Sequence, residues 1–269
     1  MDAKLVFLIL TFSISILGMV AFVVALIQKQ VLVPPSAARS IFSDGKSGHK
    51  ELDQPGKQSE IWKALDQSAK APILFFLVSS VIWLVLGSIF GLLVSFKFHS
   101  PDFLGTQALL TFGKLRPLHL NIIAYGWLSF AALGIALWLV PRLTRVPLQN
   151  TKVLYAAGVL WNIGVILGCI GILFGYTDGL EWLEFWWPID ILLAIAGAMV
   201  AIPLFHTIYL SKEKHLYVTM WYTIAALIWF PVLFVIANSH FLHTGVQQAI
   251  ANWWFAHNVL GLWVTPLGL

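Results

Sequence analysis

Two histidines inside long apolar runs are the side chains of this sequence best suited to metal chemistry. His119 follows residues 112–118 (FGKLRPL), and His257 lies within residues 253–261 (WWFAHNVLG). A polar side chain in apolar surroundings is costly, so it needs a specific partner. Imidazole nitrogen is a common ligand of haem iron and of copper. Each histidine is therefore either a metal ligand or a packed side chain that is hydrogen-bonded to a neighbouring helix.

The residues around the two histidines limit what each can do alone. Arg116 lies about one helical turn before His119, and its guanidinium suits a haem propionate or a lipid headgroup. No second candidate ligand lies three or four residues from His257, so its helix alone cannot supply a copper or zinc site. The sequence has no glycine-rich phosphate loop, nucleophile–base pair or CxxC motif. Hydrolytic and nucleotide chemistry are therefore not indicated.

The composition places both histidines in a membrane. Of the 269 residues, 59% are hydrophobic and 10% are charged, whereas a soluble domain carries about 25% charged residues. About 20 apolar residues are needed to cross a bilayer as a helix. We therefore expect an all-α integral membrane protein, a bundle of about seven transmembrane helices. The apolar runs that predict them are 4–27, 72–96, 117–140, 153–175, 187–210, 217–237 and 248–269.

The first 70 residues differ from the rest. The first apolar run is long for a cleaved signal peptide, so residues 1–27 are predicted to form an N-terminal anchor helix. Residues 28–70, which include the pair Pro34 and Pro35 and a polar stretch, are predicted to be a cytoplasmic linker. Residues 71–269 then hold a unit of six helices.

Loop charge predicts the orientation. Loops 28–70, 141–152 and 211–216 hold twelve of the 16 basic residues, and loops 97–116, 176–186 and 238–247 with Lys4 hold four. Basic loops stay in the cytoplasm, so the N-terminus is predicted to be periplasmic. The net charge of +4 is explained in this way and indicates no nucleic acid partner. The external loop 176–186 is acidic, with Asp178, Glu181 and Glu184.

Other polar or reactive residues in the spans have simpler expected roles. Asp190 lies three residues into the span 187–210 and is expected to reach the membrane interface. Asn162 and Thr223 are expected to hydrogen-bond between helices. Cys169, the single cysteine, is expected to pack as a small hydrophobic side chain.

Two stretches carry a resemblance to a known family. Residues 112–119 (FGKLRPLH) resemble the start of helix II in subunit I of haem–copper oxidases, specifically of the cbb3 type. Residues 245–249 (GVQQA) and 253–261 resemble helix VI of the same subunit. The resemblance covers about 71–269. Nitric oxide reductases share the helix II pattern but place a glutamate at the equivalent of Gly261, so Gly261 favours the cbb3 type.

The resemblance implies roles for three residues. His119 would be an axial ligand of a low-spin haem b, with Arg116 near a haem propionate. His257 would be the catalytic ligand of a copper that faces a high-spin haem. The implied function is a respiratory terminal oxidase that oxidises cytochrome c and reduces oxygen to water, coupled to proton translocation. Its partners would be other oxidase subunits, including c-type cytochromes, and lipid of the bacterial cytoplasmic membrane.

The resemblance also implies that ligands are missing from this sequence. The family's other copper histidines and its further haem ligands would lie beyond Leu269, so we expect residues 71–269 to be the N-terminal portion of the core and inactive alone. One alternative is a nitric oxide reductase-like subunit with haem and non-haem iron. The other is a transporter or assembly protein, which predicts discontinuous helices or paired charges within the membrane.

Overall fold

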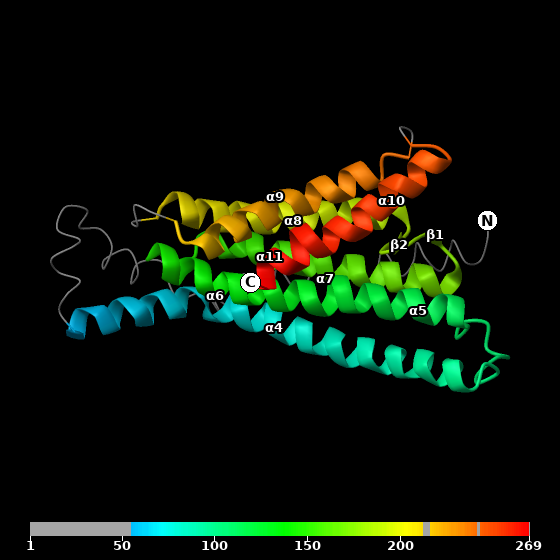
Figure 1. The fold of residues 1–269 in the computed structure, drawn as a ribbon. Coiled ribbons are helices and arrows are strands. Elements are labelled where there is room, and N and C mark those ends of the chain that lie inside the picture. The colour runs from blue at the N-terminus through cyan, green and yellow to red at the C-terminus, as the bar shows by residue number, and fades with distance from the viewer. Residues whose placement is uncertain (1–54, 212–215, 241–242, 269) are drawn as a thin grey trace.

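The computed structural model is an elongated bundle of helices that run along a common long axis (Figure 1). It describes residues 55–211, 216–240 and 243–268. The predicted anchor helix 1–27 lies outside these residues, as does most of the predicted linker 28–70. The described part confirms the expected fold class, an all-α membrane protein.

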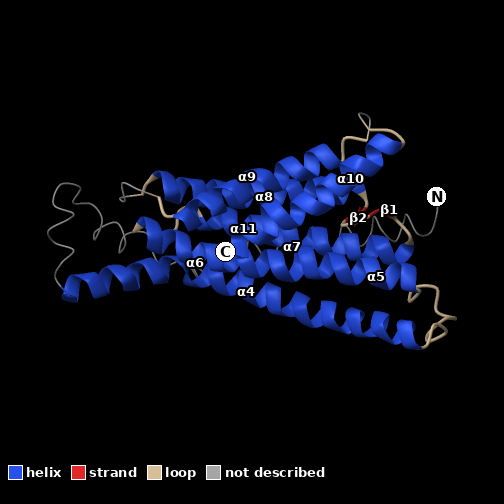
Figure 2. Cartoon of the chain, viewed as in Figure 1, coloured by secondary structure: helices blue, strands red, loops and turns tan. Residues whose placement is uncertain are grey.

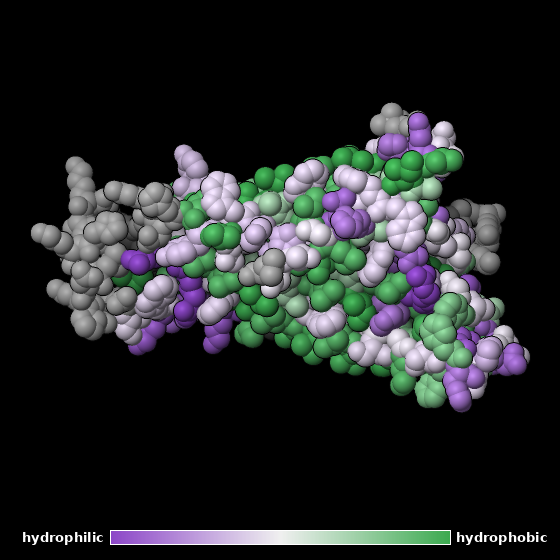
Figure 3. Space-filling model, viewed as in Figure 1, coloured by the Kyte–Doolittle hydropathy of each residue, from purple (hydrophilic) through white to green (hydrophobic). Residues whose placement is uncertain are grey.

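Five helical segments of the described chain are long and apolar enough to cross a membrane. The first belongs to α4 (Pro55–His99), and the second is formed by α5 (Phe112–Asn121), η1 (Ile122–Leu128) and α6 (Ser129–Thr144) in succession. The others are α7 (Thr151–Phe174), α8 (Trp187–Tyr209) and α9 (Val218–Ala237). They confirm the five spans expected between residues 72 and 237. A broad apolar band crosses the middle of the molecule, and hydrophilic residues gather toward its two ends (Figure 3).

The last expected span is helical but differs in character. It consists of α10 (Val246–Asn258), η2 (Val259–Val264) and α11 (Thr265–Gly268), and it is not among the five apolar segments. The reason is its polar content, which includes Gln247, Gln248, Asn252 and His257. The predicted helix is therefore present over the described residues 246–268, whereas its expected character as an apolar membrane span is not confirmed.

The structure differs from the predicted linker 28–70 at its end, because α4 already begins at Pro55. Residues 59–70 (SEIWKALDQSAK) are rich in good helix formers. Leu65 is fully buried, and the Asp66 carboxylate pairs with the Arg142 guanidinium of α6 at 2.7 Å. These contacts let the helix continue beyond the apolar run.

A short β-hairpin in the loop between α7 and α8 was not expected from the sequence (Figure 2). Strand β1 (Thr177–Leu180) pairs antiparallel with β2 (Leu183–Phe185). The hairpin places Glu184 in the interior, with 4% of its surface exposed.

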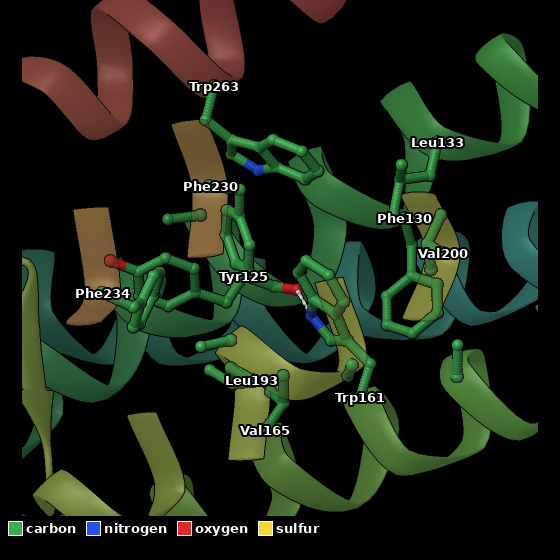
Figure 4. Close-up of a cluster of buried hydrophobic side chains, with 14 of the residues drawn as sticks. Tyr125, Phe130, Leu133, Trp161, Val165, Leu193, Val200, Phe230, Phe234 and Trp263 are labelled. Atoms are coloured by element: carbon green, nitrogen blue, oxygen red, sulfur yellow. Dashed lines mark hydrogen bonds between the residues drawn. The ribbon is translucent and has the colours of Figure 1, made fainter. Parts of the chain in front are cut away.

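Aromatic side chains fill the core between α6, α7, α9 and η2 (Figure 4). The Trp161 ring stacks on Phe230 at a centroid distance of 4.8 Å and on Trp263 at 5.9 Å. Its indole N–H donates to the backbone carbonyl of Tyr125 at 2.9 Å, as the dashed line in Figure 4 marks. Cys169 is buried as a free thiol, as predicted.

Of the roles predicted for polar residues in the spans, one is confirmed and two are wrong. Asn162 joins helices, because it accepts a hydrogen bond from the Trp83 indole at 2.8 Å. Thr223 instead donates to the Thr219 carbonyl of its own helix at 2.9 Å, since a threonine hydroxyl easily reaches the preceding turn. Asp190 does not reach the interface, because α8 packs with this residue inward and fully buried.

Candidate functional site

His119 lies on α5 and is partly buried against α4. Its Nδ1 lies 2.8 Å from the backbone carbonyl oxygen of Gly87. A carbonyl can only accept, so Nδ1 carries a proton, and in the neutral form of the ring the lone pair lies on Nε2. Nε2 has no hydrogen-bond partner among the described residues. The Gly87 carbonyl therefore favours the tautomer that can bind a metal through Nε2.

Two glycines of α4 allow α5 to pack closely, and one of them faces His119. A Cβ at Gly91 would lie 2.7 Å from Cε1 and 2.9 Å from Nδ1 of His119, and a Cβ at Gly87 would meet Ile123 at 2.7 Å. The two glycines are four residues apart, the spacing that lets membrane helices approach closely. Their Gly-x-x-x-Gly spacing is a signal in the sequence that was not used to predict the site.

Both histidines directly precede a π-helical segment. Segment η1 begins three residues after His119, and η2 begins two residues after His257. Such segments are rare and occur often at functional sites. The two segments thus support the choice of these two histidines, and nothing in the hydropathy pattern predicts them.

His257 lies on the outer face of α10, with its side chain exposed. The sequence predicted either a metal ligand or a side chain packed against a neighbouring helix. The second possibility is wrong within the described residues, because α10 turns its opposite side, with Asn252 and Phe255, toward the bundle. Its exposed neighbours on the same face are apolar, namely Ile250, Trp253 and Leu260. A Cβ at Gly261 would meet nothing within 4 Å.

The β-hairpin connects the helices that carry the two histidines. The Arg116 guanidinium of α5 pairs with the Glu181 carboxylate at 2.6 Å. The Asn252 amide of α10 donates to the backbone carbonyl of the same Glu181 at 2.9 Å. Arg116, the residue predicted to contact a haem propionate, is therefore already paired with a carboxylate of the chain. Both side chains of this ion pair are partly exposed.

A second hairpin contact lies two residues after His119. The Asn121 amide donates to a Glu184 carboxylate oxygen at 2.7 Å. Burial raises the pKa of the Glu184 carboxyl from 4.5 to about 7, and the hydrogen bond from Asn121 acts in the opposite direction. Glu184 is thus a buried acid that titrates near neutral pH, a property that its expected place in an external loop did not indicate.

The described residues fit one axial position of a haem and do not form a complete copper site. A free Nε2 on a ring cradled by Gly91 suits a haem iron. No group of three His, Cys, Asp or Glu in the described chain can hold a metal ion. The two histidines also lie apart in the packing, since α5 packs on α4 and α7 whereas α10 packs on α9.

The comparisons with known proteins cover the part of the chain that holds both histidines. Residues 71–269 match the family model described as cytochrome c and quinol oxidase polypeptide I. A cbb3-type cytochrome c oxidase subunit CcoN1 from Stutzerimonas stutzeri is 28% identical over 199 residues, which are 71% of this chain and 42% of that protein. A cytochrome c oxidase subunit 1 homolog from Agrobacterium tumefaciens is 27% identical, over 70% of this chain and 37% of its own.

A cytochrome c oxidase subunit 1 homolog from Azorhizobium caulinodans is 25% identical over 85% of this chain and 44% of its own length. The chain therefore spans less than half the length of each of these relatives.

Proposed function

Because the chain belongs to the cytochrome c and quinol oxidase polypeptide I family, we propose that it acts in the catalytic subunit of a respiratory terminal oxidase. The proposed reaction is oxidation of cytochrome c and reduction of oxygen to water, coupled to proton translocation. Family membership implies haem and copper as cofactors. The particular roles of residues in this chain are part of the proposal.

The observation that carries the proposal is the geometry of His119. Its Nδ1 is held by the Gly87 carbonyl, its Nε2 has no described partner, and a π-helical segment follows it. His119 would hold the iron of a low-spin haem b through Nε2, while the Gly87 carbonyl keeps the proton on Nδ1. That haem would supply single-electron transfer.

Arg116 and His257 are proposed to contact a haem propionate and a copper ion, respectively. Arg116 is proposed to hold a haem propionate from its partly exposed position, where its pair with Glu181 keeps the guanidinium in place. His257, exposed on α10 with apolar neighbours, is proposed as one ligand of the copper beside a high-spin haem. The other copper ligands are proposed to come from outside the described residues.

Location and partners follow from the same assignment. The chain is a multi-pass membrane protein. We place it in the bacterial cytoplasmic membrane, with the N-terminus periplasmic, since loops 141–152 and 211–216 carry basic residues. The proposed partners are other oxidase subunits, including c-type cytochromes, with cytochrome c as electron donor.

The test compares His119→Ala and His257→Ala with the wild type in the complete enzyme purified from membranes. Reduced-minus-oxidised spectra should lose the low-spin haem signal only in His119→Ala. Copper content should fall only in His257→Ala, while oxygen turnover should drop at least 100-fold in both. Unchanged spectra and turnover contradict the proposal. Iron in place of copper in the wild type, with turnover on nitric oxide, favours the reductase alternative.

A further inference from the structure

We propose that Gly91 of α4 is a positioning residue that sets the orientation of the His119 ring. This inference rests on the proposed role of His119 as a haem ligand. It concerns a residue that would act on the haem iron only through the His119 ring, against which its backbone lies. Gly91 lies one helical turn after Gly87, whose carbonyl accepts the Nδ1 hydrogen bond of the same ring.

The backbone of Gly91 lies very close to the His119 ring. A Cβ at Gly91 would lie 2.7 Å from Cε1, 2.9 Å from Nδ1 and 3.3 Å from Nε2 of His119. Distances below 3.0 Å are not tolerated, so any side chain at this position displaces the ring or separates α4 from α5. The imidazole of His119 therefore packs directly against the backbone of Gly91.

Two contacts from one helix define the orientation of the ring. The Gly87 carbonyl determines the direction of Nδ1–H, and the bare backbone of Gly91 bounds the side of Cε1. Partners of this kind fix the tautomer and orientation of a ligand histidine and raise its basicity. An imidazole that holds a haem iron would tune that iron, so Gly91 would influence the haem through His119.

Other glycines at the contacts of α4 face different side chains. A Cβ at Gly87 would meet Ile123 and Ile122, although the Gly87 carbonyl itself holds the ring. A Cβ at Gly134 of α6 would meet Leu77 of α4. Among the described glycines, Gly91 alone has its Cβ position directed at His119. Helix packing and ligand positioning can therefore be separated by comparing substitutions at Gly91 and Gly134.

The experiment compares Gly91→Ala with Gly134→Ala in the complete enzyme purified from membranes. Both add one methyl group at a helix contact of α4, against the movable end of a side chain. Gly91→Ala should lengthen the Nδ1–H···O contact, weaken the imidazole as a donor, raise the midpoint potential of the low-spin haem and shift its EPR g values. Gly134→Ala, whose Cβ would meet Leu77 and not His119, should leave the midpoint potential and the g values near wild type. Equal shifts in the two variants, or no shift in Gly91→Ala, overturn the inference.

A double-mutant cycle gives a second readout that does not depend on haem spectra. Gly91→Ala is introduced into wild type and into His119→Ala, and the thermal unfolding temperature in detergent is measured. Removal of the ring should abolish most of the destabilisation caused by Gly91→Ala, and equal destabilisation in both backgrounds contradicts the inference. A normal low-spin haem in His119→Ala would instead refute the proposed function, so the two failures are distinguishable.

Discussion

The buried carboxyl of Glu184 makes the stability of the folded chain depend on pH. Its surface is 4% exposed, and burial raises its pKa from 4.5 to about 7. At a pH between these two pKa values the folded state binds more protons than the unfolded state, so the free energy of unfolding falls as the pH rises. This decrease in the free energy of unfolding is complete above pH 7. It amounts to about 3 kcal/mol, at about 1.4 kcal/mol per pKa unit.

Glu184→Gln should therefore flatten the pH dependence of unfolding. Glutamine keeps an oxygen that accepts the Asn121 amide hydrogen bond, but it has no charge to bury. We expect the thermal unfolding temperature of wild type to fall from about pH 5 to about pH 8, with Glu184→Gln losing that slope. Glu181→Gln, a change at the partly exposed neighbouring carboxylate, is the control. An unchanged slope in Glu184→Gln would contradict this account.

The two candidate histidines stand out in the sequence, whereas the contacts around them do not. His119 and His257 are candidates because a polar side chain in an apolar run needs a specific partner. The Gly-x-x-x-Gly spacing marks Gly91 as a helix-contact residue, but its closeness to His119, like the contact of Glu184 with Asn121, depends on distances between segments that no local pattern records. Asp190 was misplaced because sequence position alone does not say which side of a helix end faces the bundle.

The two π-helical segments are joined by hydrogen bonds across the core. The Trp263 indole of η2 donates to the Ser129 hydroxyl at 3.0 Å. The Ser129 hydroxyl in turn donates to the Ala124 carbonyl of η1 at 2.8 Å. The helix that follows His119 is thereby tied to the helix that follows His257, although the histidines themselves are apart.

Ser129→Ala should weaken this connection by about 1–3 kcal/mol, because it leaves a buried indole N–H without its acceptor. The measurement is the free energy of unfolding in mixed micelles. Ser95→Ala is the matched control, since that hydroxyl is exposed and bonds only within its own helix. Ser129→Ala in a Trp263→Phe background should cost clearly less than in wild type. An equal loss of stability from Ser129→Ala in both backgrounds would show that Ser129 and Trp263 are not energetically coupled.

The β-hairpin depends on close packing against α7. A Cβ at Gly168 would lie 2.3 Å from Cδ1 of Phe185 in β2, and that ring is fully buried. Gly168→Ala should therefore destabilise the protein by about 1–3 kcal/mol through overpacking. It should also increase proteolysis near the hairpin. Gly113→Ala, where a Cβ meets nothing within 4 Å, should be neutral or slightly stabilising. The same loss in both variants would argue against this contact.

Elements were predictable from the sequence where hydrophobicity alone determines them. The helices of residues 72–237 follow from apolar runs near the length that crosses a bilayer. The hairpin could not be predicted in this way, because it is held by contacts between distant segments. Phe185 packs against Gly168, and Asn121 donates a hydrogen bond to Glu184. The helical start of α4 was missed for the same reason, since its ion pair is with Arg142 of another helix.

The whole molecule has two ends that differ in charge. The loops after α6 and α8 lie at one end, and the loops after α4, α7 and α9 lie at the other (Figure 1). The first end carries Arg142, Arg145 and Lys152, whereas the second carries the acidic hairpin together with Lys97, Lys114 and Arg116. This grouping of the loops is the one that the loop charges predicted, and the apolar band lies between the two ends (Figure 3).

Cysteine labelling can decide which end faces the cytoplasm. The single cysteine is buried, so Cys169→Ser gives a cysteine-free background at little expected cost to the fold. Lys152→Cys and Thr106→Cys then introduce thiols at exposed positions of opposite ends. Since basic loops are retained in the cytoplasm, a membrane-impermeant maleimide should label Thr106→Cys in intact spheroplasts and Lys152→Cys only in inverted vesicles. The reverse pattern would invert the proposed topology, whereas labelling of both thiols from one side would contradict a membrane-spanning bundle.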